Sequence, residues 1–84
     1  MRLYLQIPAL EGRVPRFFQL IIQPDLITGW SLIRESGQQG SPGRVTRTHH
    51  ESYEEAVELM TTWRDKQINR GFKVVYMKGM DLPQ

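Results

Sequence analysis

Hydrophobic and polar residues alternate along five segments of this chain, and a period of two residues is typical of β-strands. In the segment 16–23, Phe18, Leu20 and Ile22 share one face, while the other face is mixed and is predicted to be only partly covered. The segment 44–50 has a single aliphatic residue, which indicates a solvated strand near a sheet edge. The alternation predicts strands over residues 2–7, 16–23, 30–35, 44–50 and 72–77.

A period of three to four residues begins after residue 50 and predicts one long amphipathic helix over residues 52–70. Ser52 followed by Glu55 forms a capping box, which marks a helix N-terminus. Acidic residues lie in the first two turns and basic residues near the end, the order that the helix dipole favours. Gly71 suits the C′ position, where a positive φ ends a helix. The apolar face is expected to consist of Tyr53, Ala56, Val57, Leu59, Met60, Trp63, Gln67 and Ile68.

These elements predict an α+β fold, an antiparallel sheet of four to five strands with one long helix packed across one face. A single domain covers residues 1–84, since a chain of this length has no room for a second core. We place the core at residues 16–77, with an N-terminal strand and connector over 1–15 and a tail over 78–84.

Other large side chains are expected to complete the core. Trp30 is expected to be a core anchor at the start of its strand. Leu26 and Ile27, in the loop before it, are candidates to fold back on the core. In the last predicted strand, one face is expected to carry Phe72, Val74 and Tyr76.

The stretch 30–45 predicts a β-hairpin with a long, glycine-rich tip. Its first half alternates as a strand, and a second strand follows the glycines. Gly37, Gly40 and Gly43 are expected to supply the positive φ angles of a tight connection, and Pro42 fixes one φ and removes a hydrogen-bond donor.

This hairpin resembles the WGR domain. The similarity consists of Trp-Ser-Leu-Ile-Arg-Glu over residues 30–35, a Gly-x-x-Gly-Ser-Pro-Gly turn over 37–43, and Arg-Val at 44–45. It extends from about Arg16 to about Tyr76, most of the chain, and is greatest to the short bacterial members of the family.

The resemblance implies contact with DNA through the hairpin tip, where the family carries the Trp-Gly-Arg tripeptide that names it. In some poly(ADP-ribose) polymerases the same module accompanies the catalytic domain and contacts DNA and neighbouring domains. In this chain the three positions hold Ser36, Gly37 and Gln38. Ser36 cannot stack on a sugar or base, and Gln38 carries no charge, so Arg44 is a candidate to replace the missing cation.

Arginine is concentrated in the first half of the chain, although the net charge is only +2, from 11 Lys+Arg against 9 Asp+Glu. Arginine suits bidentate contacts with phosphate. Cysteine is absent, which excludes disulfides and thiolate metal sites. No apolar run is long enough to span a bilayer and no secretory signal pattern is present, so we expect a cytoplasmic protein without a membrane partner. Residues 1–50 hold three acidic residues against Arg2, Arg13, Arg16, Arg34, Arg44 and Arg47.

No nucleophile, base and orienting group can be assigned from motifs, so the sequence favours a non-catalytic protein that uses no cofactor. The two histidines, His49 and His50, are adjacent, and consecutive residues of a strand point to opposite faces. With no other histidine and no cysteine, we expect no metal site.

The function that the sequence favours is nucleic-acid binding through the hairpin 34–47, with DNA preferred to RNA. Arginine and amide side chains beside free N–H groups contact phosphate and sugar without reading sequence. The alternative is a protein-interaction module, including a homodimer, formed through the exposed edge 44–50 or through an apolar sheet face that carries Phe17, Ile21 and Ile33. The candidate nucleic-acid contacts are Arg34, Ser36, Gly37, Gln38, Arg44 and Arg47.

Overall fold

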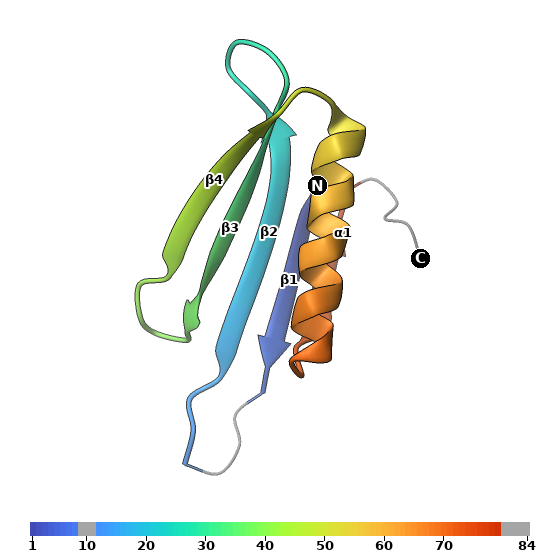
Figure 1. The fold of residues 1–84 in the computed structure, drawn as a ribbon. Helices are drawn as coiled ribbons and strands as arrows, with labels where there is room; N and C mark the ends of the chain where they lie inside the picture. The colour runs from blue at the N-terminus through green and yellow to red at the C-terminus, as the bar shows by residue number, and fades with distance from the viewer. Residues whose placement is uncertain (9–11, 80–84) are drawn as a thin grey trace.

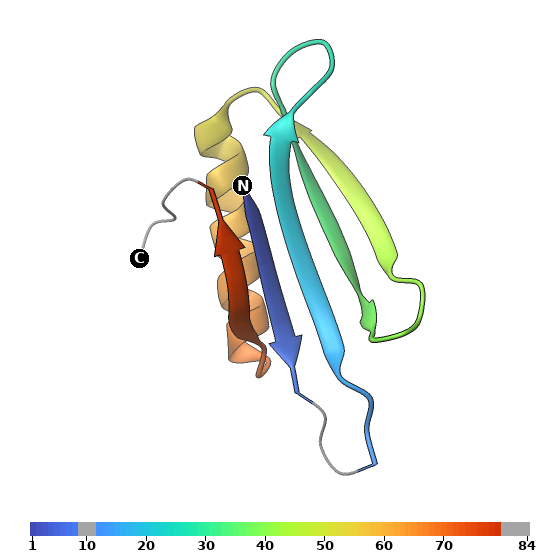
Figure 2. The same ribbon diagram turned by 180° about the vertical axis from the view of Figure 1, so that it is seen from behind.

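One antiparallel sheet and one helix make up residues 1–8 and 12–79, the part of the chain that the computed structural model describes. The strands are ordered β4-β3-β2-β1-β5 across the sheet. Helix α1 lies against one face (Figure 1), and Figure 2 shows the opposite face without a described helix over it. The predicted α+β fold is confirmed. The elements are β1 (Arg2–Ile7), β2 (Arg16–Pro24), β3 (Trp30–Gln38), β4 (Arg44–His50), α1 (Tyr53–Asn69) and β5 (Lys73–Lys78).

The N-terminal strand β1 is an internal strand of the sheet, because it pairs with β2 on one side and with β5 on the other. Its side chains Leu3 and Leu5 are completely buried. The sequence placed the core at residues 16–77 and treated this strand as an addition to it. The structure corrects that assignment, since β5 joins the sheet through β1. Periodicity identifies a strand but does not give its neighbours.

The core lies between α1 and the sheet face that carries the alternating apolar residues. Phe18, Leu20 and Ile22 of β2 lie on this face, because side chains two residues apart point to the same side of a strand. Trp30 and Trp63 are partly exposed and pack against the same cluster. The buried hydrophobic residues are Leu3, Leu5, Phe18, Leu20, Ile22, Leu32, Ala56, Met60 and Phe72.

Helix α1 begins and ends at the caps that its sequence predicts. At the start, the Glu55 N–H donates to the Ser52 hydroxyl oxygen at 3.1 Å. At the end, the Phe72 N–H donates to the Gln67 carbonyl oxygen at 3.0 Å. This is the hydrogen bond of a Schellman cap that spans more residues of the chain. Gly71 has the positive φ, +103°, that this cap requires. The caps fix where the chain leaves α1 and enters β5.

Three hydrophobic side chains are more exposed than predicted. Leu26 and Ile27 are 98% and 95% exposed, so they do not fold back on the core. Their loop is turned outward by Asp25, whose N–H donates to the Gly29 carbonyl oxygen at 3.0 Å and whose Oδ1 accepts from the Leu26 N–H at 2.8 Å. Ile68, near the end of α1, is 44% exposed because it lies at the margin of the apolar face.

The last strand places Tyr76 on the face opposite to the predicted one. The register between β1 and β5 shifts between Tyr4 and Leu5, so that Tyr4 pairs with Tyr76 whereas Leu5 pairs with Val74. An irregularity of this kind adds a residue to one strand and reverses the side on which later residues point. Tyr76 therefore lies beside Tyr4 on the face that α1 does not cover.

Candidate nucleic-acid interface

The hairpin of β3 and β4 has a shorter tip than the sequence predicts. Strand β3 continues through Ser36, Gly37 and Gln38, all of which pair with β2. The connection is therefore the loop 39–43. Of the three glycines assigned to the turn, only Gly40 has a positive φ, +82°. The sequence was wrong about the other two because glycine also occurs where side chains leave no room.

Gly37 and Gly43 are required by close packing. A Cβ on Gly43 would lie 3.0 Å from the Phe17 Cζ and 3.0 Å from the Ser36 carbonyl oxygen. A Cβ on Gly37 would lie 3.1 Å from the Gly43 Cα and 3.5 Å from the Phe17 ring. Gly43 thus leaves the space in which the Phe17 ring lies, and Gly37 allows the close approach of the Gly43 backbone.

Strand pairing divides the predicted contact residues between the two faces of the sheet, so the structure does not bring all six together. The helix-covered side carries Arg34, Ser36, Gln38 and Arg44, in register with buried Leu32. The uncovered face carries Gly37 and Arg47. Ser36 and Arg44 are direct cross-strand partners.

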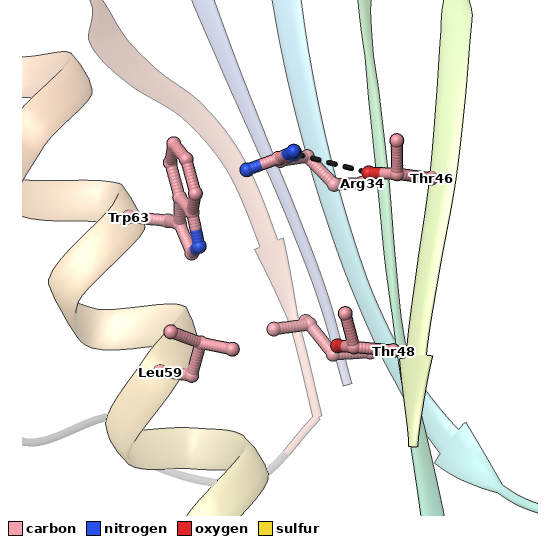
Figure 3. A pocket seen from close by; sticks show the side chains of 6 residues that line it. Arg34, Thr46, Thr48, Leu59 and Trp63 are labelled. Carbon is pink, nitrogen blue, oxygen red and sulfur yellow. Dashed lines mark hydrogen bonds between the residues drawn. The ribbon is translucent and has the colours of Figure 1, made fainter. Parts of the chain in front are cut away.

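Arg34 makes its main contacts within the protein. Its Cζ lies 3.8 Å from the centroid of the Trp63 ring, a cation–π geometry, and its Nε donates to the Thr46 hydroxyl oxygen at 3.1 Å. Lys66 Nζ lies 4.9 Å from the same ring centroid. Figure 3 shows Arg34 directed from the sheet toward Trp63 on α1. The groove between them, about 300 Å³, is lined by Leu32, Arg34, Thr46, Thr48, Leu59 and Trp63.

Basic side chains gather at the end of the molecule that holds the loop 39–43. The ends of β1, β3 and α1 and the starts of β2, β4 and β5 meet there (Figure 1). Within the described residues, the ion pairs join carboxylates to His49, His50 and Arg64, so the cations at this end have no carboxylate partner there. This surface, the basic end, consists of Arg13, Arg16, Arg44, Lys66, Arg70 and Lys73.

Arg16 and Arg44 flank the end of β3 on the same side of the sheet. Arg16 pairs with Gln38, and Arg44 pairs with Ser36. Both arginines are exposed, and the Arg16 guanidinium lies 5.9 Å from the centroid of the Phe72 ring. The two cations are therefore held at strand ends, with polar Ser36 and Gln38 between them.

Carboxylates gather at the opposite end of the molecule, where α1 begins. Arg2 and Lys78 also lie at this second end, and the other described carboxylates, Glu35 and Asp65, lie nearer the basic end. The balance of charge is still more negative where α1 begins, so a polyanion is attracted more strongly to the basic end. The carboxylates at this second end are Asp25, Glu51, Glu54, Glu55 and Glu58.

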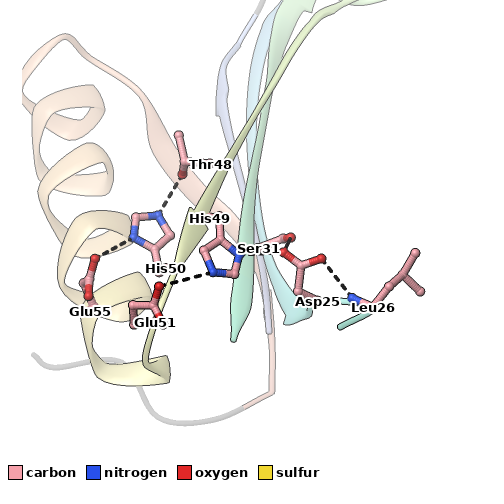
Figure 4. A network of polar contacts seen from close by, with 8 residues as sticks. All are labelled: Asp25, Leu26, Ser31, Thr48, His49, His50, Glu51 and Glu55. Carbon is pink, nitrogen blue, oxygen red and sulfur yellow. Dashed lines mark hydrogen bonds and ion pairs between the residues drawn. The ribbon is translucent and has the colours of Figure 1, made fainter. Parts of the chain in front are cut away.

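The carboxylate of Asp25 joins a polar network at that end (Figure 4). Its Oδ2 accepts from the Ser31 hydroxyl at 3.0 Å and lies 2.8 Å from His49 Nδ1. The hydrogen bond with His49 lowers the pKa of Asp25, and in turn raises the pKa of His49. In a Ser-His-Asp catalytic triad, the imidazole lies between the serine hydroxyl and the carboxylate. Here the Ser31 hydroxyl and the His49 ring both contact Oδ2 of Asp25, so these three residues are not arranged as a triad. The network holds the loop 25–29 against β4.

His50 points away from this network, as expected for the next residue in a strand. Its Nδ1 lies 3.3 Å from Glu55 Oε1, and its Nε2 lies 2.7 Å from the Thr48 hydroxyl. In residues 1–8 and 12–79, no three His, Asp or Glu side chains are grouped as a metal ion would need.

Sequence reasoning selected one residue of the basic end, Arg44. The other five lie next to the ends of correctly predicted elements, so each position carried a signal of its own. What joins them is the order of the strands, and alternation does not encode that order. The residues missed were Arg13, Arg16, Lys66, Arg70 and Lys73.

No protein-family model, curated protein or solved structure matches this chain. Within the described residues, no helix is long and apolar enough to cross a membrane.

Proposed function

We propose that this protein is a non-catalytic nucleic-acid-binding module that contacts the phosphate backbone with its basic end. The observation that carries the proposal is the presence of six Lys and Arg side chains at the end of the molecule that holds the loop 39–43, without carboxylate partners among the described residues. Each cation that pairs with a phosphate releases a counterion, which makes the binding favourable and dependent on salt.

The resemblance to the WGR domain supports DNA as the nucleic acid, because that family contacts DNA at the equivalent hairpin. Ser36 and Gln38 occupy the positions of the family's Trp and Arg, and both lie in a paired strand. We assign the cationic contacts to Arg44 and Arg16 on either side of them. Contacts of this kind position a nucleic acid without reading its sequence, so little sequence preference is expected.

Fluorescence anisotropy with labelled duplex and single-stranded DNA, at about 50 mM and about 200 mM salt, tests the proposal. Binding should be tighter at the lower salt concentration. The double variant Arg16→Gln, Arg44→Gln should bind both DNAs more weakly, with a slope of log affinity against log salt reduced by about two units on duplex DNA. An unchanged affinity and slope in this variant would overturn the assignment to the basic end.

A matched control separates local charge from net charge. Adding Glu54→Gln and Glu58→Gln to the double variant restores the net charge of +2 while leaving the basic end depleted. Both glutamates are exposed and lie near the start of α1, at the far end of the molecule. The quadruple variant should bind as weakly as the double variant. Recovery of wild-type affinity would mean that net charge alone drives the binding.

The second candidate function is protein interaction, and the loop 25–29 favours it. Leu26 and Ile27 are almost completely exposed on a loop that the hydrogen bonds of Asp25 hold in place. Exposed apolar side chains of this size are withdrawn from water when a partner covers them. Sedimentation equilibrium of the wild type and of Leu26→Ser, Ile27→Ser tests self-association. A dimer that the variant abolishes supports this candidate, and a wild-type monomer rules out the homodimer.

A further inference from the structure

The sheet face opposite α1 carries three aromatic side chains on adjacent strands, and no described helix covers it (Figure 2). Phe17 of β2 and Tyr4 of β1 have parallel rings, with an interplanar angle of 3° and centroids 6.0 Å apart. Tyr76 of β5 is the direct cross-strand partner of Tyr4 and is 48% exposed. The aromatic row therefore runs across β2, β1 and β5.

The row begins at the basic end. The Phe17 ring lies in the space left by Gly43 of the hairpin. Gln39 of the loop 39–43 donates from its Nε2 to the Tyr4 hydroxyl oxygen at 3.0 Å. Arg16 and Arg44 lie on the other face of the sheet, so a ligand that contacts them and the first rings of the row would pass around the end of the sheet at the loop 39–43.

The charge of the uncovered face matches a polyanion. The strand register places four basic residues on this face. Within the paired segments of the strands, Glu35 is the one carboxylate on the same face. The Glu35 carboxylate is in turn engaged by the Gln19 side-chain amide at 3.3 Å. The four basic residues are Arg2, Arg47, Lys73 and Lys78.

We infer that this face binds single-stranded nucleic acid, with bases stacked on Phe17, Tyr4 and Tyr76 and phosphates paired with the surrounding cations. Aromatic rings on an uncovered sheet, flanked by basic side chains, are a recurring way to bind unpaired bases, because every base has a flat face. In a duplex those faces are stacked on each other and cannot reach the rings. The inference rests on the proposed function and narrows its ligand to single strands.

The test uses anisotropy with four labelled oligonucleotides of equal length: single-stranded DNA, single-stranded RNA, duplex DNA, and a single strand that carries abasic sites in its centre. The variant is Tyr76→Leu, which keeps an apolar side chain at a half-exposed edge position and removes the ring. Tyr76→Phe is the matched control that keeps the ring. Circular dichroism confirms that each variant is folded.

Wild type should bind the single strand with bases more tightly than the abasic strand, by about 5- to 160-fold for each stacked base. Tyr76→Leu should reduce the affinity for the single strands with bases by a factor of this size and should leave the affinity for the abasic strand unchanged. Tyr76→Phe should bind as the wild type does. The ratio of DNA to RNA affinity identifies the natural strand.

Two results separate this inference from the proposed function. If Tyr76→Leu binds all four oligonucleotides as the wild type does, the aromatic row does not stack bases. If the double variant Arg16→Gln, Arg44→Gln still loses affinity in the same experiment, the basic end remains a phosphate site. If no oligonucleotide binds the wild type at low salt, both proposals fail.

Discussion

Replacing Gly43 with alanine tests the packing that positions the Phe17 ring. The φ of Gly43 is not positive, so alanine can adopt its backbone conformation. The added Cβ would lie 2.9 Å from the Glu35 Cγ, 3.0 Å from the Phe17 Cζ and 3.0 Å from the Ser36 carbonyl oxygen. The flexible Glu35 side chain can move away, but the backbone oxygen cannot.

The expected cost follows from two opposing effects. Forcing an extra carbon into packed surroundings destabilises a protein by about 1–3 kcal/mol. Replacing glycine with alanine also reduces the freedom of the unfolded chain, which stabilises the folded state by about 0.4–1 kcal/mol. Gly43→Ala should therefore lower the free energy of unfolding by up to about 2.6 kcal/mol, and at the middle of this range, about 1.3 kcal/mol, Tm falls by roughly 5–10 °C.

Urea unfolding followed by tryptophan fluorescence measures this cost, since the chain has two tryptophans. The same substitution in a Phe17→Leu background should cost at least about 0.5 kcal/mol less, because the two residues are in contact. Gly40→Ala is the control: no atom lies within 4 Å of its Cβ, and its φ of +82° imposes strain that Phe17 does not influence. An equal cost of Gly43→Ala in both backgrounds would refute the packing argument.

Two further predictions concern the core and the polar network. Leu20→Ala, at a completely buried site, should lower the free energy of unfolding by about 2–5 kcal/mol in the same urea assay, and a loss below about 1 kcal/mol would contradict the described core. The pair of His49 and Asp25 should stabilise the fold most between pH 3.8 and 6.5, the ordinary pKa values of the two groups, because both are then charged. The stabilisation by this pair is lost as pH rises through the raised pKa of His49 and as pH falls through the lowered pKa of Asp25. His49→Gln should therefore cost more stability at about pH 5.5 than at about pH 8.5. An equal cost at the two pH values would contradict this coupling.

Local signals in the sequence were sufficient for the elements of this fold. The helix boundaries follow from Ser52 and Gly71, since each cap is made by residues adjacent in the chain. Alternation identified the five strands and the buried face of β2, where Phe18, Leu20 and Ile22 are buried. These features depend on side chains within a few residues of one another, which is the range over which a pattern is informative.

Long-range features of the site could not be predicted in this way. The position of β1 between β2 and β5 depends on pairing partners that lie far apart in the chain. The shift of Tyr76 to the uncovered face depends on one irregular pair between those strands. Gly37 was assigned to a turn because glycine marks turns, whereas its neighbour Phe17 is twenty residues earlier in the sequence. The basic end and the aromatic row both result from such pairings.

The most direct test of the account is to observe which backbone amides of the isotopically labelled protein change their NMR shifts when a short single-stranded DNA is added at low salt. Changes are expected at Arg16, Arg44 and Lys73, and at Tyr4 and Tyr76 on the uncovered face. The loop 25–29 and the first turn of α1 should not change. Changes confined to that loop, or none at any amide, would contradict binding at the basic end.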